Sequence, residues 1–291
     1  MGKFITYLSL ILVAVLWAGA TVSAKAGLQE LAPVLLSILR FLVAIPILIL
    51  ILYTRQNEKL KIINSTRDLP VFLVLGLSGV TLFYFLQYNS LLYTSASIGS
   101  IVVNTNPIFI ALFSAFLNKE RIGIKRTLGI FISFFGLCLV LTNGDFNFYV
   151  NFTTIYGAFL MLLAAICWGI YTVVGKKILR DYSPLASTTI TFIIGTLCFL
   201  PLLLNIELPE RITLVGWFSV FYLGIASSVL GYLLYNRALS KLEASEAGVF
   251  LYTIPLFAIL LSALFLGEAI TWAILTGGVL VVYGIYLAER S

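Results

Sequence analysis

Arg40 is the only clearly charged side chain inside a long apolar run of this sequence, about a third of the way along residues 33–53. Its guanidinium offers five N–H donors in a planar fork that fits a carboxylate in a bidentate arrangement. A charge within an apolar span is costly and commonly marks a functional site. We therefore expect Arg40 either to hold the carboxylate of a bound solute or to act as a structural arginine that binds helix-end carbonyls or extends outward to the membrane surface.

Several aromatic and polar residues recur in pairs at nearly constant separations. The pairs are Trp17 with Trp168, 151 residues apart, and Tyr84 with Tyr232, Asn104 with Tyr252 and Pro107 with Pro255, each 148 residues apart. Gln87 lies one helical turn from Tyr84. We predict that these side chains and Arg40 line a central pathway for a solute. The alternatives are core packing for the tryptophans and hydrogen bonding between helices for the tyrosines.

Pro107 and Pro255 fall near the middle of the apolar runs 95–117 and 245–266. Each removes one backbone donor and frees the carbonyl four residues earlier, at Val103 and Leu251. Freed backbone in the middle of a membrane must face protein or a water-filled cavity. We expect both prolines to break helices beside the pathway, at positions suited to gating. The alternative is a packing kink whose polar groups are satisfied locally.

The residue types give little support to catalysis or metal binding. The sequence has no histidine, and Cys138, Cys167 and Cys198 lie in apolar runs without a CxxC pair. No Asp or Glu lies in the middle of an apolar run, so a proton relay built on carboxylates is not expected. We predict no enzyme activity, no cofactor and no metal site.

The elements that must position these residues are apolar helices. The 291-residue chain is 61% hydrophobic and 10% charged, against about 45–50% and about 25% in soluble domains. A bilayer can solvate that much apolar surface, and about 20 apolar residues span it as a helix. Ten runs are long enough: 5–24, 33–53, 69–90, 95–117, 123–142, 155–175, 184–204, 213–235, 245–266 and 269–288. We predict an all-α membrane protein with ten transmembrane helices.

Lysine and arginine are distributed unevenly among the loops. With the N-terminus placed inside, 15 of the 18 basic residues lie on the inner side, and only Lys25 and Arg211 lie outside. Cytoplasmic loops carry such an excess. The pattern predicts a multi-pass protein of the plasma or inner membrane with both termini in the cytoplasm. It also accounts for the net charge of +6 without a nucleic-acid partner.

The paired residues belong to an internal repeat. NTNPIFIALFSAFLNKE at 104–120 returns in related form as YTIPLFAILLSALFLGE at 252–268. Each copy holds five predicted spans, an odd number, so the second copy must enter the membrane from the opposite side. We predict two inverted five-helix repeats, at residues 1–142 and 155–291, an architecture typical of secondary transporters.

Other matched residues have simpler expected roles. Lys25 and Lys176 are expected to reach the lipid headgroups at opposite membrane faces. Glu120 and Glu268, at span ends, are expected to form hydrogen bonds with loops. Paired glycines are expected to be close contacts between helices, namely Gly76, Gly129, Gly136, Gly224, Gly277 and Gly284.

The mid-span proline followed by a span-end glutamate, the early tryptophan of each half and the two five-span halves resemble the EamA family of the drug/metabolite transporter superfamily. The resemblance covers nearly the whole chain. It implies inward termini, a central cavity between the halves, and alternating access. It also implies export or exchange of small metabolites, often amino acids, with an exporter of aromatic amino acids as the best-fitting example. Arg40 matches no family-wide motif, so its role depends on the membrane argument alone.

We therefore predict a secondary transporter that exports or exchanges small organic metabolites, such as amino acids, as a monomer or homodimer in the bilayer. One alternative is a multidrug or other metabolite efflux protein of the same superfamily. Another is a membrane receptor or assembly subunit that transports nothing, which solute flux in liposomes would distinguish.

Overall fold

Every regular element that the computed structural model describes is a helix. The structure describes residues 2–54, 68–106, 108–110, 112–113, 124–144, 151–179, 181–206, 208–242, 251 and 253–289. Pro107, Glu120 and Tyr252, on which predictions above depend, lie outside the described residues.

The helices fall into long single segments and two composite rods. The chain begins with α1 (Gly2–Gly27) and α2 (Pro33–Thr54). The first rod joins α3 (Leu69–Gly76), the π-helical η2 (Leu77–Leu82) and α4 (Phe83–Tyr93). Next come α5 (Ala96–Val103), α7 (Ile124–Thr142), α8 (Phe152–Ile178), α9 (Pro184–Phe199) and the 3-10 segment η3 (Leu200–Asn205). The second rod joins α10 (Leu214–Phe221), the π-helical η4 (Tyr222–Gly231) and α11 (Tyr232–Leu239), and is followed by α13 (Ile254–Leu266) and α14 (Trp272–Glu289).

Six described segments are long and apolar enough to cross a membrane: Phe4–Gly27, Pro33–Thr54, Leu69–Tyr93, Phe152–Ile178, Pro184–Leu204 and Leu214–Ala238. Four shorter apolar helices lie at Ala96–Ile110, Leu128–Val140, Ile254–Leu266 and Trp272–Gly284. Large apolar side chains such as Phe131, Phe134 and Leu264 are mostly exposed. Lipid can solvate such a surface, whereas its exposure to water would cost free energy. The protein is therefore a multi-pass membrane protein, and the count of ten spans stays a prediction.

Short polar residues and a glycine set several helix ends. Ser95 Oγ accepts a hydrogen bond from the Ile98 N–H at 3.1 Å before α5, and Ser183 Oγ accepts one from the Ala186 N–H at 3.2 Å before α9. These bonds satisfy first-turn N–H groups that lack a partner within the helix. α13 ends at Gly267, whose φ of 67° is left-handed and costs glycine little.

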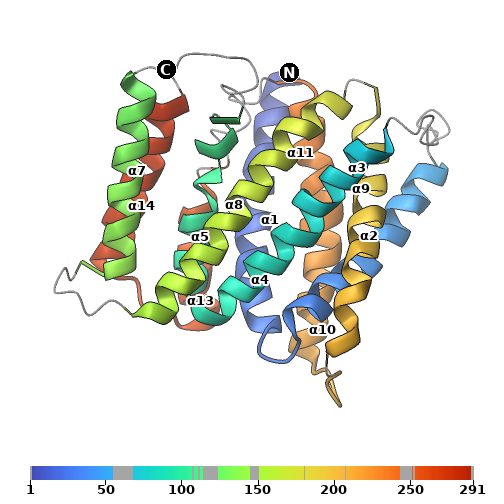
Figure 1. Cartoon of the computed structure of the whole chain (residues 1–291), viewed down its shortest axis with the longest axis horizontal. Helices are drawn as coiled ribbons and strands as arrows, with labels where there is room; N and C mark the ends of the chain where they lie inside the picture. Colours follow the sequence, from blue (N-terminus) through green and yellow to red (C-terminus); the bar gives the residue numbers. More distant parts are fainter. Residues whose placement is uncertain are drawn as a thin grey trace.

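α1 occupies the middle of the bundle, where it packs against α13, η4, α11, α10 and α5 (Figure 1). α4 runs along α8, α9 packs against α3 and η2, and α2 packs against η4 and α9. In Figure 1, α1 descends from its N-terminus while α8 ascends, and α7 descends beside an ascending α14. Helices from the first part of the chain are thus interleaved with helices from the second part around a common core.

Glycines bring α7 and α14 together at one side of the molecule (Figure 1). A Cβ built on Gly284 would lie 2.5 Å from the Gly129 carbonyl oxygen. A Cβ built on Gly136 would lie 2.7 Å from the Gly277 carbonyl oxygen. Side chains at these positions would push the two backbones apart. The close helix contacts predicted for these glycines are therefore confirmed.

Two hydrogen-bonded ties hold loops against the starts of the rods. Glu30, between α1 and α2, accepts hydrogen bonds from Oγ1 and the N–H of Thr213 at 2.6 and 2.8 Å, just before α10. These bonds lower the pKa of Glu30 below its ordinary value. The Tyr182 hydroxyl, between α8 and α9, donates to the Asp68 carboxylate at 2.8 Å, just before α3. Each tie joins a loop from one part of the chain to a rod from the other.

Candidate functional site

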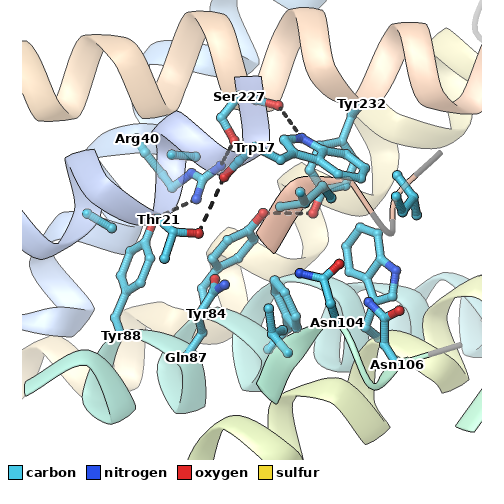
Figure 2. A pocket seen from close by; sticks show the side chains of 17 residues that line it. Trp17, Thr21, Arg40, Tyr84, Gln87, Tyr88, Asn104, Asn106, Ser227 and Tyr232 are labelled. Atoms are coloured by element: carbon cyan, nitrogen blue, oxygen red, sulfur yellow. Dashed lines mark hydrogen bonds between the residues drawn. The ribbon is translucent and has the colours of Figure 1, made fainter. Parts of the chain in front are cut away.

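A cavity of about 70 Å³ lies among α1, α2, α4, α5, α8, η4, α11 and α13 (Figure 2). Aromatic, small and polar side chains form most of its wall: Trp17, Ala20, Thr21, Ala24, Arg40, Phe83, Tyr84, Gln87, Tyr88, Val103, Asn104, Asn106, Trp168, Ser227, Tyr232, Leu251 and Ile254. All seven predicted pathway residues that the structure describes are in this wall. That a solute passes along it stays a prediction.

Arg40, on α2, is only 1% exposed and reaches the cavity between α4 and η4. Its Nε and Nη2 donate to Ser228 Oγ at 3.0 and 2.7 Å, and Nη2 also donates to Ser227 Oγ at 3.1 Å. Nη1 donates to the Tyr88 hydroxyl at 2.5 Å. The guanidinium carbon lies 4.1 Å from the centroid of the Tyr84 ring, in cation–π contact. Arg40 is therefore a buried cation held by hydroxyl groups and an aromatic face.

Arg40 and the hydroxyl groups that bind it keep hydrogen-bond donors that these bonds do not use. A guanidinium has five N–H groups, and the bonds to Ser227, Ser228 and Tyr88 use four of them. The hydroxyls of Ser227 and Tyr88 accept from Arg40, and each keeps its own O–H to donate. No carboxylate binds Arg40 within the described part of the chain, and its partners there are hydroxyls rather than helix-end carbonyls. The site therefore combines spare donors with an unneutralised positive charge, which an anion would satisfy.

The π-helical segment η4 positions both serines. A π-helical turn takes in one residue more than an α-helical turn, and such turns are frequent at functional sites. Within this segment the Ser228 hydroxyl donates to the carbonyl oxygen of Leu223, five residues earlier, at 2.8 Å. η2 occupies the matching place in the first rod. Tyr84 and Tyr232 are 148 residues apart, and adding 148 to the residue numbers of η2 places it within η4.

Three aromatic rings form a further part of the wall. Trp17 and Trp168 meet edge to face with ring centroids 5.7 Å apart, and Tyr232 packs against each of them at 5.6 Å. Trp17 Nε1 donates to the Ser227 carbonyl oxygen at 3.2 Å. Trp168 Nε1 is buried without a hydrogen-bond partner among the described residues. The two tryptophans are thus both packed in the core and exposed to the cavity, which combines the two roles expected for them.

Tyr84 and Tyr232 meet at the centre of the cavity (Figure 2). Their hydroxyl oxygens are 2.8 Å apart and share one hydrogen bond. This bond joins α4 to α11, so the interhelical hydrogen bond offered as an alternative is present. Both rings also line the cavity, so the two roles coexist.

Two asparagines and a glutamine complete the polar wall. Gln87 lines the cavity from α4, and Asn104 lines it from the end of α5. Asn104 Nδ2 donates to the Ser100 carbonyl oxygen at 2.7 Å, one turn back. Asn106, which we did not predict, also lies in the wall, and its buried Oδ1 has no partner within the described residues.

Pro255 begins a helix. α13 starts at Ile254, and Pro255 lies in its first turn, where a missing N–H costs no intrahelical hydrogen bond. The break expected here is therefore located before the proline and not within a continuous helix. Pro107 and Tyr252 lie outside the described residues, so their predicted roles stay predictions.

Glu268, which was predicted to form hydrogen bonds with loops, binds the first turn of a helix instead. Its carboxylate accepts hydrogen bonds from the Ala96 N–H at 2.6 Å and from the N–H and hydroxyl of Ser97 at 3.0 and 2.6 Å. These groups lie at the N-terminus of α5, where backbone N–H groups lack helical partners and favour a negative charge. The contact fixes the segment between α13 and α14 to α5.

Lys25 was predicted to extend to the lipid headgroups, but its side chain binds backbone carbonyls instead. Its Nζ donates to the Thr94 carbonyl oxygen at 2.8 Å and to that of Leu91, at the C-terminal end of α4. Helix C-termini present carbonyls without intrahelical partners, and these attract a cation. Lys176, the matched residue on α8, is exposed, as expected for a lysine that reaches the headgroups.

Tyr88, Ser227 and Ser228 bind Arg40 but were not predicted. Tyr88 lies one helical turn after Tyr84, so the helical period contains a signal for it. The serines have no comparable signal, because the pairs that guided the prediction had to recur in both copies. Within the described residues, no three His, Cys, Asp or Glu side chains gather as metal ligands would.

The profile of the EamA-like transporter family matches residues 4–142 and 155–289. This protein belongs to the EamA-like transporter family. Its relatives include an uncharacterized transporter of Archaeoglobus fulgidus, 32% identical over 288 residues, which are 98% of each chain. The uncharacterized transporter YdfC of Bacillus subtilis is 31% identical over 272 residues, covering 93% of this chain and 86% of YdfC. A crystal structure at 20% identity has a TM-score of 0.69 over 98% of this chain and 95% of its own, which shows a shared fold.

Membership of the EamA-like family gives the cavity its context. The family and the names of its relatives indicate a transporter rather than an enzyme. A transporter implies a small-molecule solute and a lipid bilayer. The solute site of an EamA-like protein is expected between the helices of the bundle, where this cavity lies.

Proposed function

We propose that this EamA-like protein is a secondary transporter that exports or exchanges small carboxylate-bearing metabolites, namely amino acids or related compounds. The observation that supports this most directly is the state of Arg40. Its guanidinium is buried, lines the cavity and is bound in the described structure by neutral hydroxyls. An unneutralised buried charge is costly, and a bound carboxylate would reduce that cost.

The cavity volume supports a mechanism of alternating access. About 70 Å³ is room for a few water molecules, whereas ligand pockets measure about 300–1,000 Å³. A solute of amino-acid size therefore requires the helices around the cavity to move apart. In the proposed mechanism, opening of the bundle toward each membrane face in turn would move the solute across.

The proposed architecture is ten spans in two inverted five-helix repeats, residues 1–142 and 155–291, in the plasma or inner membrane. Two separate matches to one family profile, at 4–142 and 155–289, support the duplication. The opposite directions of α1 and α8 support the inversion (Figure 1). The distribution of basic residues favours cytoplasmic termini. The working unit is a monomer or homodimer.

The charge of the cavity favours this proposal over efflux of cationic drugs. Aromatic walls suit many drugs, but the positive charge of Arg40 repels a cation inside a medium of low dielectric constant. The described cavity wall also contains no carboxylate to attract one. A receptor or assembly subunit would show no flux at all.

The test is counterflow in proteoliposomes with amino acids, other carboxylates and cationic drugs, each with and without a pH gradient. Wild-type protein should exchange a carboxylate-bearing solute without a gradient. Arg40→Gln should raise the half-saturation concentration of that solute about ten- to hundredfold, the effect of losing one charge-assisted interaction. Arg211→Gln makes the same change at an exposed loop residue and should have no effect.

Both variants must elute as the wild type does in size-exclusion chromatography. Transport of the carboxylate solute by Arg40→Gln at the wild-type half-saturation concentration would remove Arg40 from the site. Exchange of cations alone by the wild type would replace this proposal with drug efflux.

A further inference from the structure

A second hollow, of about 160 Å³, lies between the start of α1 and the end of α11. The two helix ends lie beside each other at the top of Figure 1. Small side chains leave the space between them, namely Thr6 and Ser9 on α1 and Ala238 on α11. We call this hollow the α1–α11 groove. It shares no lining residue with the central cavity.

The α1–α11 groove lies where both helices reach the edge of the apolar part of the membrane. Ile5, in its wall, is the second residue of the candidate span Phe4–Gly27. Ala238, also in its wall, is the last residue of the candidate span Leu214–Ala238. Lipid headgroups occupy this level of a bilayer. The groove is therefore placed to contact headgroups, whichever membrane face the two helix ends reach.

Two basic side chains line the groove. Arg237 lies in the last turn of α11, and Lys241 follows four residues later in the turn that closes this helix. Both are exposed, and none of the described residues that line the groove is an aspartate or glutamate. An arginine binds a phosphate through its planar fork, and a lysine adds a compact positive charge on a flexible stem. The groove thus presents two cations to an anion.

Apolar side chains continue from the groove into the membrane. Leu8 and Leu12 follow Ile5 one and two turns further along α1, and Leu230 lies four residues before Leu234, which lines the groove. Leu8, Leu12 and Leu230 are exposed on the surface of the bundle. Acyl chains would cover these side chains, whereas a free phosphate would gain nothing from them.

We propose that the α1–α11 groove binds the headgroup of an anionic phospholipid, with the phosphate between Arg237 and Lys241 and the acyl chains along the exposed leucines. Basic pockets between transmembrane helices bind anionic headgroups in this way. The bound lipid contacts both α1 and α11 and holds their ends together. The site is separate from the central cavity and does not depend on which solute the protein transports.

The experiment titrates purified protein in neutral detergent with phosphatidylglycerol, and with phosphatidylcholine of the same acyl chains, whose headgroup has no net charge. Native mass spectrometry counts the bound lipid, and thermal unfolding measures stabilisation, because a ligand of the folded state raises the unfolding temperature. Wild-type protein should retain one phosphatidylglycerol and be stabilised more by it than by phosphatidylcholine. Arg237→Gln with Lys241→Gln should raise the half-saturating concentration about thirtyfold, the effect of losing two charges at the headgroup level.

Two further variants separate a site from general attraction to positive charge. Lys176→Gln with Lys177→Gln removes the same charge from an exposed pair at the end of α8, so it should leave the affinity nearly unchanged. Ser9→Phe keeps both basic residues and fills the groove, so it should also weaken binding of phosphatidylglycerol. Attraction to surface charge alone would be insensitive to Ser9→Phe.

Unfolding of a variant at the wild-type temperature in phosphatidylcholine shows that it is folded. Both double variants change exposed side chains, so they test the site independently of Ser9→Phe. An unchanged affinity in the Arg237 and Lys241 variant, or an equal loss in the Lys176 and Lys177 variant, would overturn the proposal. So would full affinity in folded Ser9→Phe. Equal stabilisation by glycerol phosphate, which has the phosphate without the acyl chains, would replace the lipid with a free phosphate.

Discussion

Arg40 exchanges the hydration of its guanidinium for hydroxyl groups that come from two other helical segments. Ser227 and Ser228 belong to η4, and Tyr88 belongs to α4. Hydroxyls solvate the charge without neutralising it, whereas a carboxylate from the protein would form an ion pair and occupy the fork. The arrangement keeps the guanidinium buried and still able to bind an anion. At the residue scale, the chemistry of the cavity therefore depends on which groups hold Arg40.

Ser228 should contribute more to stability than Ser227. Ser228 Oγ accepts from two guanidinium nitrogens, whereas Ser227 Oγ accepts from one at 3.1 Å. We expect Ser228→Ala to lower the free energy of unfolding by about 1.5–3 kcal/mol, the range for hydrogen bonds to a charged group. Ser227→Ala should lower it by less, because Ser227 makes one longer contact with the guanidinium where Ser228 makes two. Unfolding in mixed micelles measures both values. Ser9→Ala, on the exposed surface of α1, is the control. Equal losses at the two serines would contradict this account of Arg40.

The sequence allowed part of the cavity to be predicted because the aromatic residues recur. Trp17 with Trp168 and Tyr84 with Tyr232 could be found by comparing two stretches of one chain. Ser227 and Ser228 could not, because Gly79 and Val80 stand at the matching positions 148 residues earlier. Asn106 was missed for a different reason: an unsatisfied carbonyl is a property of the folded environment, which no residue spacing shows.

At the scale of the elements, the apolar runs predicted the long helices to within a few residues, because lipid requires backbone groups to bond within a segment. The π-helical segments η2 and η4 were not predicted. Gly79 of η2 shows why, since a Cβ there would lie 2.2 Å from the Tyr171 ring. The conformation of each rod depends on contacts with helices far away in the sequence, which a local pattern does not contain.

The contact between α7 and α14 should tolerate no side chain at its closest point. A methyl group at Gly284 would meet the Gly129 carbonyl oxygen at 2.5 Å, whereas one at Gly278, on the same helix, would meet Ile101 Cδ1 at an ordinary 3.5 Å. We expect Gly284→Ala to destabilise the protein by about 1–3 kcal/mol, the usual cost of overpacking. Gly278→Ala should be neutral or slightly stabilising, because alanine favours helix. Thermal unfolding in detergent compares the two, and equal unfolding temperatures would refute the close packing.

At the scale of the whole molecule, the cavity combines a symmetric wall with an asymmetric charge. The tyrosine pair lies on matching positions and meets at the centre. Arg40 has no charged counterpart, because Thr191 stands at the matching position, 151 residues later. Asn236 likewise replaces Tyr88, and its Nδ2 donates to Thr188 at 2.9 Å instead of serving a cation. In the inverted repeat that we propose, the scaffold would move symmetrically while one of its sides binds the charged end of the proposed solute.

Opposite orientation of the two parts is the strongest requirement of this account, and reporter fusions test it. Five spans before residue 148 would bring the chain to the outer face, and five more would return it to the cytoplasm. Alkaline phosphatase fused after residue 148 should therefore be active, because it folds only outside, and green fluorescent protein fused at the same point should be dark. Both reporters fused after Ser291 should give the reverse result.

The physical reason for this topology is the 15-to-2 distribution of basic residues, because loops rich in lysine and arginine resist translocation. An active cytoplasmic reporter at residue 148 would mean that both parts enter the membrane the same way up. Arg40 and the aromatic pairs could then not belong to one pathway opened alternately to the two faces.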